Sequence, residues 1–163
     1  MTVSLHWVDE EDLLFTKLLD LRWRVLREPL GMERGTENNF LDGKPRTTHL
    51  VAVNNSNVVG TITIWMIPNS NQVRLDQVCV DVDWQKKGVG SKLVKEFLRV
   101  IQNKSTVKTT NKTVSGNYNS IFVHSRVSAV KFYQSLGFEI EGESFLEVGI
   151  PHINMTINFD DEK

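Results

Sequence analysis

The residues best suited to chemistry lie where an apolar run meets a helix-like segment through two glycines. Val78, Cys79 and Val80 end the apolar run, and Gly88 and Gly90 open an amphipathic stretch. A helix N-terminus leaves several backbone N–H groups without partners, and the helix dipole adds positive potential there. Glycines let a ligand approach this backbone closely. The arrangement predicts an anion-binding loop, and phosphate is the usual anion at such a loop.

The spacing of the glycines excludes two common classes of phosphate-binding loop. The Walker A pattern GxxxxGK[ST] does not occur in the sequence, and the dinucleotide fingerprint GxGxxG fails because its third glycine would be Leu93. The loop fits the looser pattern Q/R-x-x-G-x-G/A, filled by Gln85, Gly88 and Gly90. Taken alone this pattern is weak, because any Gly-x-Gly at a helix start would match it.

Hydrophobic periodicity places the elements that must position this loop. Alternating or β-branched runs predict strands at 3–7, 50–53, 58–66, 73–80, 121–124, 138–148 and 153–159. Helical spacing predicts helices from an N-cap at Asp9 to Leu26, after Gly88, and over 128–136, with a short helix near 37–41. The order of these elements predicts a mixed sheet with helices on its faces, in one domain over residues 1–163.

Residues 103–119 interrupt this pattern with a run of Lys, Thr, Asn and Ser. Val107, Val114 and Tyr118 are its clearly apolar or aromatic positions. Such a composition buries too little apolar surface to offset chain ordering, so we expect a long, solvated, flexible and dispensable loop.

Composition limits the classes of function. The chain has 163 residues, of which 40% are hydrophobic and 24% charged, and this is typical of a globular protein. A formal net charge of −1 supplies no global basic field for nucleic acid or a membrane surface. One cysteine excludes an intrachain disulfide and a CxxC metal motif. Without a secretory signal or a long apolar run, we expect a cytoplasmic protein that binds neither nucleic acid, membrane nor metal.

Together with two downstream segments, the glycine loop resembles the GNAT superfamily (Gcn5-related N-acetyltransferases), whose acetyl-CoA motif is this pattern placed after a V-x-V strand. Residues 129–138, AVKFYQSLGF, are similar to the family's second motif, A-x-x-F-Y-x-x-x-G-F. Residues 142–152, GESFLEVGIPH, resemble the ending G-E-x-F-x-E-x-G-I-P-H of the ElaA/YjcF-like branch. Three ordered motifs that cover most of the chain are far more specific than one.

The resemblance implies the GNAT acyl-CoA acyltransferase fold, a mixed and mostly antiparallel sheet of about six or seven strands with splayed central parallel strands. It implies direct transfer of an acetyl group from acetyl-CoA to an amine in a ternary complex, and a homodimer is common for the fold. The backbone near Val78 would stabilise the oxyanion. The residues implied in acetyl-CoA binding are Val78, Cys79, Val80, Gln85, Lys86, Lys87, Gly88, Val89, Gly90, Ser91, Arg126, Phe132 and Tyr133.

Three residues are implied in catalysis. Tyr133 is expected to protonate the CoA thiolate, although Phe132 and Tyr133 are also a plausible packing pair. Glu147 and His152 are both candidates for the base that deprotonates the amine. The glutamate is alternatively a partner of Arg126, and the histidine alternatively fixes the turn after Pro151.

The acceptor side is less defined by sequence. Arg27 and Glu143, with Glu147 and His152, are candidate acceptor ligands, and a solvated arginine face is the plainer interpretation of Arg27. Cys79 suits an acetyl-cysteine mechanism less well, because a lone cysteine in an apolar strand is usually inert. The other histidines, His124 among them, are expected in core or surface roles.

Three alternatives to a small-molecule acetyltransferase stay open. A GNAT domain that senses acyl-CoA without transfer would not need Tyr133. A protein acetyltransferase is disfavoured by the short chain and the absence of an acidic tail. A nucleotide-binding regulator would lack both nucleotide fingerprints.

Overall fold

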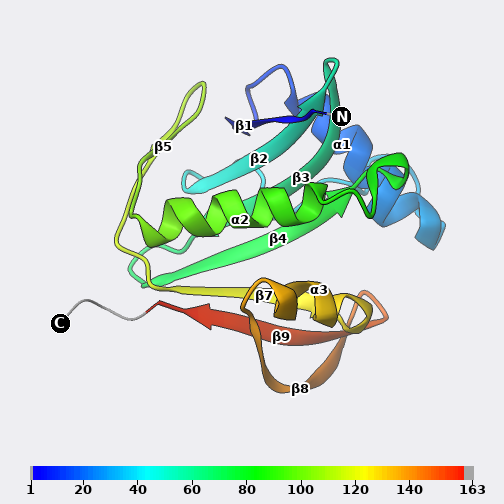
Figure 1. The fold of residues 1–163 in the computed structure, drawn as a ribbon. Coiled ribbons are helices and arrows are strands. Elements are labelled where there is room, and N and C mark those ends of the chain that lie inside the picture. The colour runs from blue at the N-terminus through cyan, green and yellow to red at the C-terminus, as the bar shows by residue number, and fades with distance from the viewer. Residues whose placement is uncertain (1, 160–163) are drawn as a thin grey trace.

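A computed structural model describes residues 2–159. In it, a mixed sheet of seven strands is flanked by helices (Figure 1). The strand order is β1-β2-β3-β4-β7-β9-β8, and every neighbouring pair is antiparallel except β4 with β7. The strands are β1 Ser4–Val8, β2 Thr47–Asn54, β3 Asn57–Met66, β4 Gln72–Val80, β7 Ser120–Arg126, β8 Glu139–Glu147 and β9 Ile150–Asn158. The prediction of a mixed sheet flanked by helices is confirmed.

Helices α1 and α2 cover opposite faces of this sheet. On β2, Leu50 and Ala52 pack in the cluster beneath α2, whereas Val51 between them packs with α1. The helices are α1 Phe15–Arg22, α2 Val89–Gln102 and α3 Val130–Ser135. Short turns of π- or 3₁₀-helix lie at Trp23–Arg27, Glu28–Leu30, Val82–Trp84 and Val127–Ala129. No helix of residues 2–159 is long and apolar enough to cross a membrane.

The parallel strands β4 and β7 separate after four residue pairs. Their register runs from Gln72 opposite Ser120 to Leu75 opposite Val123 and then stops. At that point β4 carries a bulge against β3, with Gln77 at a positive φ of 49°. A bulge bends its strand away from a neighbour. The central splay implied by the family resemblance is therefore present.

The predicted helix boundaries differ from the structure at Asp9 and at 37–41. Helix α1 begins at Phe15, and the Asp9 carboxylate accepts hydrogen bonds from the backbone N–H of Glu11 and Asn111. Residues 37–41 form turns instead of a helix. The Asn39 side chain accepts from the backbone N–H of Leu41 there, a local bond that competes with helix formation.

Residues 103–119 also differ from the solvated loop that their composition predicts. They contain a hairpin of β5 Val107–Lys108 and β6 Thr113–Val114, and Val107, Val114 and Tyr118 are all buried against the α2 side of the core. The Lys112 ammonium donates to Glu10 Oε1 at 2.7 Å and to the carbonyls of Lys44 and Thr47. The hairpin is thus anchored to Glu10, to the segment 44–47 and to the core on the α2 side.

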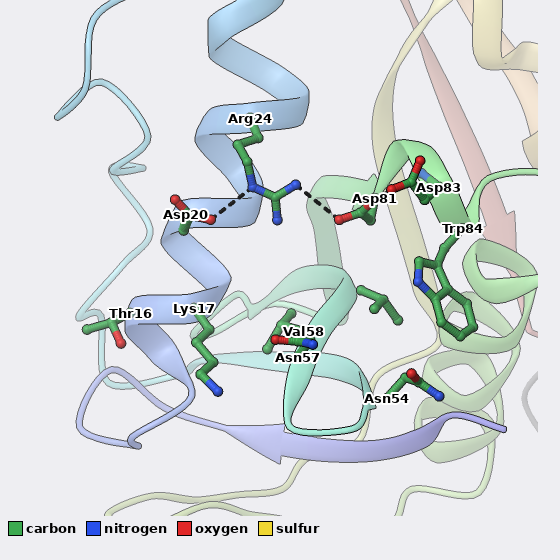
Figure 2. A pocket seen from close by; sticks show the side chains of 11 residues that line it. Thr16, Lys17, Asp20, Arg24, Asn54, Asn57, Val58, Asp81, Asp83 and Trp84 are labelled. Atoms are coloured by element: carbon green, nitrogen blue, oxygen red, sulfur yellow. Dashed lines mark hydrogen bonds and ion pairs between the residues drawn. The ribbon is translucent and has the colours of Figure 1, made fainter. Parts of the chain in front are cut away.

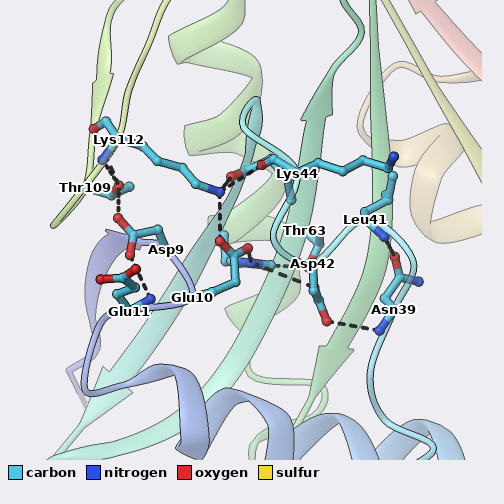
Figure 3. A network of polar contacts seen from close by, with 12 residues as sticks. Asp9, Glu10, Glu11, Asn39, Leu41, Asp42, Lys44, Thr63, Thr109 and Lys112 are labelled. Atoms are coloured by element: carbon cyan, nitrogen blue, oxygen red, sulfur yellow. Dashed lines mark hydrogen bonds and ion pairs between the residues drawn. The ribbon is translucent and has the colours of Figure 1, made fainter.

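A buried polar network connects this hairpin to α1 and to the loop before β2 (Figure 3). Arg22 is fully buried and donates to both carboxylate oxygens of Asp42, at 2.7 and 3.0 Å, and to the Thr63 hydroxyl at 2.7 Å. His49 is also fully buried, between the Thr63 hydroxyl at 2.8 Å and Glu10 Oε2 at 2.7 Å. The network ties together residues far apart in the sequence.

The pKa values within the network fix its proton pattern. Burial lowers the pKa of His49 although Glu10 opposes this effect, so the imidazole is neutral at neutral pH. Nε2–H therefore donates to Glu10, and Nδ1 accepts from Thr63. Burial of Glu10 opposes its ionisation, but hydrogen bonds from His49 and Lys112 outweigh it and lower the pKa of Glu10 to about 2. The side chains of His49 and Glu10 thus each have definite hydrogen-bond partners.

Candidate active site

A cavity of about 490 Å³ opens where β4 and β7 separate. Five parts of the fold supply its walls: the bulge of β4, the end of β7, helix α3, the β8–β9 turn, and the segment from the end of α1 to the following loop. The residues that line it are Leu26, Arg27, Asn39, Phe40, Arg74, Asp76, Gln77, Val78, Val123, His124, Ser125, Arg126, Ala129, Tyr133, Glu147, Val148 and His152.

The glycine loop lies at the start of the 14-residue helix α2. Gly88 is the N-cap with a φ of 84°, a conformation that favours glycine. A Cβ at Gly90 would lie 3.3 Å from the ring of Phe132 on α3, so any larger side chain would displace that ring. The Gln85 side chain donates to the carbonyl of Val80 and closes the loop onto β4. A helix N-terminus with this open backbone fits a pyrophosphate group.

The end of β4 offers a second fit to acetyl-CoA. Val80 and Cys79 pair with β3 on one side, while no strand of residues 2–159 pairs with β4 beyond Leu75 on the other. An open strand edge presents backbone donors and acceptors that an extended amide chain can pair with. The Cys79 side chain packs on the α1 face, and burial raises the pKa of its thiol to about 12. Cys79 is thus unsuited as a nucleophile, as its position in an apolar strand predicts.

Tyr133 is a packing residue that also lines the cavity. Its ring makes edge-to-face contacts with Phe132 and Phe138, with centroids 5.0 and 5.5 Å apart, and 5% of the residue is exposed. It also lines the cavity. Burial, aided by the negative charge of Asp76, raises the pKa of Tyr133 above its usual range. The phenol is therefore protonated at neutral pH and can donate a hydrogen bond into the cavity.

Glu147 and His152 lie together at the end of the cavity formed by β8 and β9. Glu147 Oε2 is 3.8 Å from His152 Nε2, and Glu147 Oε1 is 3.0 Å from His124 Nδ1. His152 Nδ1 is 2.7 Å from the carbonyl of Ile150, which accepts and therefore requires a proton on Nδ1. Nε2 is then the nitrogen free to gain a proton, and Glu147 is placed to stabilise the resulting cation.

Sequence reasoning did not assign His124 to this site. The signal lies in the alternation along β7, where Ile121, Val123 and Ser125 are buried and the residues between them are half-buried. This alternation places His124 on the same face of β7 as Arg126, a residue that the family resemblance assigns to acetyl-CoA binding. The register of β7 with β9 then brings His124 within reach of Glu147.

The structure separates some of the other predicted residues from this cavity. Arg27 and Arg126 line it, whereas Glu143 lies on an exposed part of β8 and does not. Lys86 and Lys87 are exposed on the glycine loop and also lie outside it. The suggested pairing of Glu147 with Arg126 is wrong, because Glu147 pairs with His124 instead.

A second cavity, of about 560 Å³, lies between α1, the β2–β3 turn and residues 81–84 (Figure 2). Two cations line it: Arg24 is paired with Asp20 at 2.9 Å and with Asp81 at 3.0 Å, and the Lys17 ammonium donates to the carbonyl of Ser56. The charge of Arg24 is matched within the protein, and Figure 2 shows both carboxylates directed toward its guanidinium. We assign no ligand to this cavity.

Glu10, Asp42 and His49 bring three possible metal-ligand atoms within 4.8 Å of one another. Both carboxylates already have cationic partners, because Lys112 contacts Glu10 and Arg22 contacts Asp42. A further cation would be repelled by these two side chains. The cluster is better described as a closed network of ion pairs and hydrogen bonds.

Comparison with known proteins links this geometry to a family. The L-amino acid N-acetyltransferase AaaT of Escherichia coli is 35% identical over 104 residues, which are 63% of this chain and 59% of AaaT. The uncharacterized protein YyaT of Bacillus subtilis is 26% identical over 108 residues, which are 66% of this chain and 64% of YyaT. The alignments thus span less than two thirds of the length of each relative.

Solved structures share the fold over nearly the whole chain. Escherichia coli ElaA superposes with a TM-score of 0.76 at 20% identity, covering 95% of this chain and 99% of ElaA. An aminoglycoside 6'-N-acetyltransferase complexed with coenzyme A has a TM-score of 0.70 at 16% identity, covering 100% of this chain and 99% of that one. The family model of the acetyltransferase (GNAT) domain matches residues 32–159. The chain therefore belongs to the GNAT acetyltransferase family.

Proposed function

We propose that this protein transfers an acetyl group from acetyl-CoA to the primary amine of a small molecule, by direct attack within a ternary complex. The observation that carries the proposal is the cavity at the β4–β7 splay. It joins an open strand edge next to the glycine loop with Tyr133, Glu147 and His152. The relative AaaT is named for L-amino acids, and this supports a small acceptor rather than a protein.

Acetyl-CoA would be held by the glycine loop and by β4. The backbone from Gln85 to Ser91 would bind the pyrophosphate, and the edge at Val78–Val80 would pair with the pantetheine arm. When bound, this co-substrate supplies an activated acetyl thioester. The Phe132 ring, packed against Gly90, would keep the helix start and α3 in a fixed relation beside it.

His152 acts as the base in this proposal. An amine acceptor is protonated at neutral pH and must lose a proton before it can attack a carbonyl carbon. His152 Nε2 accepts that proton, and Glu147 stabilises the imidazolium that results. His124 positions Glu147 through its Nδ1–H. The backbone N–H near Val78 donates to the oxygen that becomes negative as the new bond forms.

Tyr133 donates a proton to the departing sulfur. A phenol whose pKa is raised is a weaker acid, but the thiolate that it serves is desolvated in the same part of the protein. Burial raises the pKa of a thiol as well, as the value of about 12 for Cys79 illustrates. The pKa values of the phenol and of the CoA thiol are thus both raised, and proton transfer from the phenol to the thiolate stays feasible.

The test is acetyl-CoA consumption, followed by release of free thiol, across amino acids, polyamines, aminosugars and peptide amines. We expect transfer to at least one small amine, and calorimetric CoA binding that is lost in Gly90→Glu. Binding of CoA to wild type without transfer to any amine would instead identify an acyl-CoA sensor. Preferential acetylation of the peptide amines would contradict the small-molecule acceptor.

A further inference from the structure

Arg27 is a half-buried cation that faces the cavity without an anionic partner. Its Nε donates to the carbonyl of Thr36 at 2.8 Å, and one Nη2–H donates to Gln77 Oε1 at 2.9 Å. Both acceptors are neutral, and no carboxylate of residues 2–159 lies within 4.0 Å of the guanidinium. The remaining N–H groups of Arg27 have no assigned protein acceptor within the same range.

Three of the neighbouring arginines contrast with Arg27. Arg22 pairs with Asp42 at 2.7 Å, Arg24 with Asp20 and Asp81, and Arg74 with Asp76 at 3.1 Å. Each of these cations is neutralised within the protein. A half-buried guanidinium without such a partner is unfavourable, because desolvation of its charge is not compensated.

The charges around the cavity strengthen this contrast. Burial, followed by repulsion from Arg22, lowers the pKa of Arg27, although the negative charge of Asp76 opposes this effect and Arg126 adds weaker repulsion. Two carboxylates line the cavity, but Asp76 is paired with Arg74 and Glu147 is bound to His124. The cavity wall on the side of Arg27 therefore carries positive charge that a ligand can neutralise.

Arg27 is also well fixed for recognition. Its two hydrogen bonds hold the planar guanidinium between the loop at Thr36 and the β4 bulge at Gln77. A fixed guanidinium suits a carboxylate, which it binds through two parallel hydrogen bonds. The phosphates of CoA have a separate place to bind, at the start of α2, where the backbone of Gly88 is open to solvent.

We propose that Arg27 binds a carboxylate of the acceptor, so that the acceptors are amino acids rather than simple amines. The inference rests on the proposed function and names the acceptor class. The amine would lie toward Glu147 and His152, and the carboxylate toward Arg27, which all line the same cavity. Phe40 and Val148, 63% and 75% exposed, add apolar surface to its lining and favour an apolar side chain on the acceptor.

The test compares each of the twenty L-amino acids with its amide, in which a neutral group replaces the carboxylate. With leucine and leucinamide as the main pair, we expect wild type to favour leucine in kcat/KM by about 10- to 100-fold, the range of a charge-assisted hydrogen bond. Arg27→Gln should remove this preference through a higher KM for leucine, with leucinamide changed by less than about twofold.

Two further variants separate recognition from folding. Arg27→Lys keeps the charge without the planar fork, so it should retain part of the preference for leucine. Arg34→Gln is the matched control, because Arg34 is an exposed arginine that pairs with Asp20 outside the cavity. It should leave the leucine preference unchanged. Thermal unfolding of each variant shows whether a change in KM accompanies a loss of structure.

The outcomes distinguish this inference from the proposed function. If amines are acetylated but the carboxylate has no effect in wild type, or if Arg27→Gln keeps the preference, Arg27 does not bind the acceptor. Weaker CoA binding in Arg27→Gln would place Arg27 at a phosphate and likewise overturn the inference. If nothing is acetylated, the proposed function fails. Calorimetry with N-acetyl-leucine and CoA then decides, because Arg27-dependent binding supports the inference and its absence overturns it.

Discussion

Replacing Glu10 with glutamine should remove a large pH dependence of the free energy of unfolding. Glu10 accepts hydrogen bonds from both His49 and Lys112, and its side chain is 18% exposed. These bonds lower its pKa from the ordinary 4.5 to about 2 in spite of burial. At 1.36 kcal/mol for each pKa unit, this difference corresponds to about 3 kcal/mol. Glutamine keeps the size of the side chain but cannot ionise.

The direction of this pH dependence follows from the lowered pKa of Glu10. A group that is more acidic in the folded than in the unfolded protein stabilises the fold fully above the unfolded pKa of 4.5, and this contribution is lost as the pH falls toward 2. Wild type should therefore exceed Glu10→Gln in stability by the largest margin between pH 5 and 7. The margin should shrink by about 3 kcal/mol by about pH 2.

Urea unfolding at a series of pH values from 7 to about 2 measures this margin. Glu139→Gln is the control, because it removes an exposed carboxyl from β8 and leaves the network intact. A margin between wild type and Glu10→Gln that stays constant from pH 5 to the acidic limit would refute the reasoning. It would mean that Glu10 is no more acidic in the folded protein than in the unfolded chain.

Four other predictions concern the site and the hairpin. Tyr133→Phe should lower kcat by about 10²–10⁴-fold while calorimetry shows unchanged CoA affinity, and full activity in a folded variant would exclude the phenol as acid. Gly90→Glu should weaken CoA binding in calorimetry by several kcal/mol, because it displaces Phe132 and adds negative charge. His124→Phe should lower kcat about tenfold and shift the acidic limb of the kcat/KM pH profile, while His124→Asn restores much of both. A Gly/Ser linker in place of residues 103–119 should cost more than about 4 kcal/mol of stability in urea unfolding, and an unchanged midpoint would restore the original expectation of a dispensable loop.

Much of the fold was predictable because its signals are local. β3 is rich in β-branched residues, and the hairpin between β2 and β3 follows from Asn54–Asn57 between two apolar runs. The glycine loop was placed correctly at the start of α2, where Gly88 is the N-cap in a conformation that favours glycine. Local patterns of this kind require no knowledge of distant contacts.

The errors share a different cause, which is contact between segments far apart in sequence. Asp9 has the side chain of a good N-cap, but it binds Thr109 and Asn111, 100 and 102 residues away. Residues 103–119 look solvated because Val107 and Val114 are separated by polar residues, and only the hairpin register brings them together. The pairing of His124 with Glu147 likewise requires the β7–β9–β8 register, which no local pattern determines.

The four-pair seam between β4 and β7 has a mechanical consequence. The half of the sheet before the seam carries the glycine loop and the open edge of β4, while Tyr133, Glu147 and His152 belong to the half after it. Only the ladder from Gln72–Leu75 to Ser120–Val123 joins the two halves within the sheet of residues 2–159. The alignment of the two halves therefore depends on this short ladder, together with the packing of Phe132 on Gly90. Changes in shape along that ladder would alter turnover without touching either substrate.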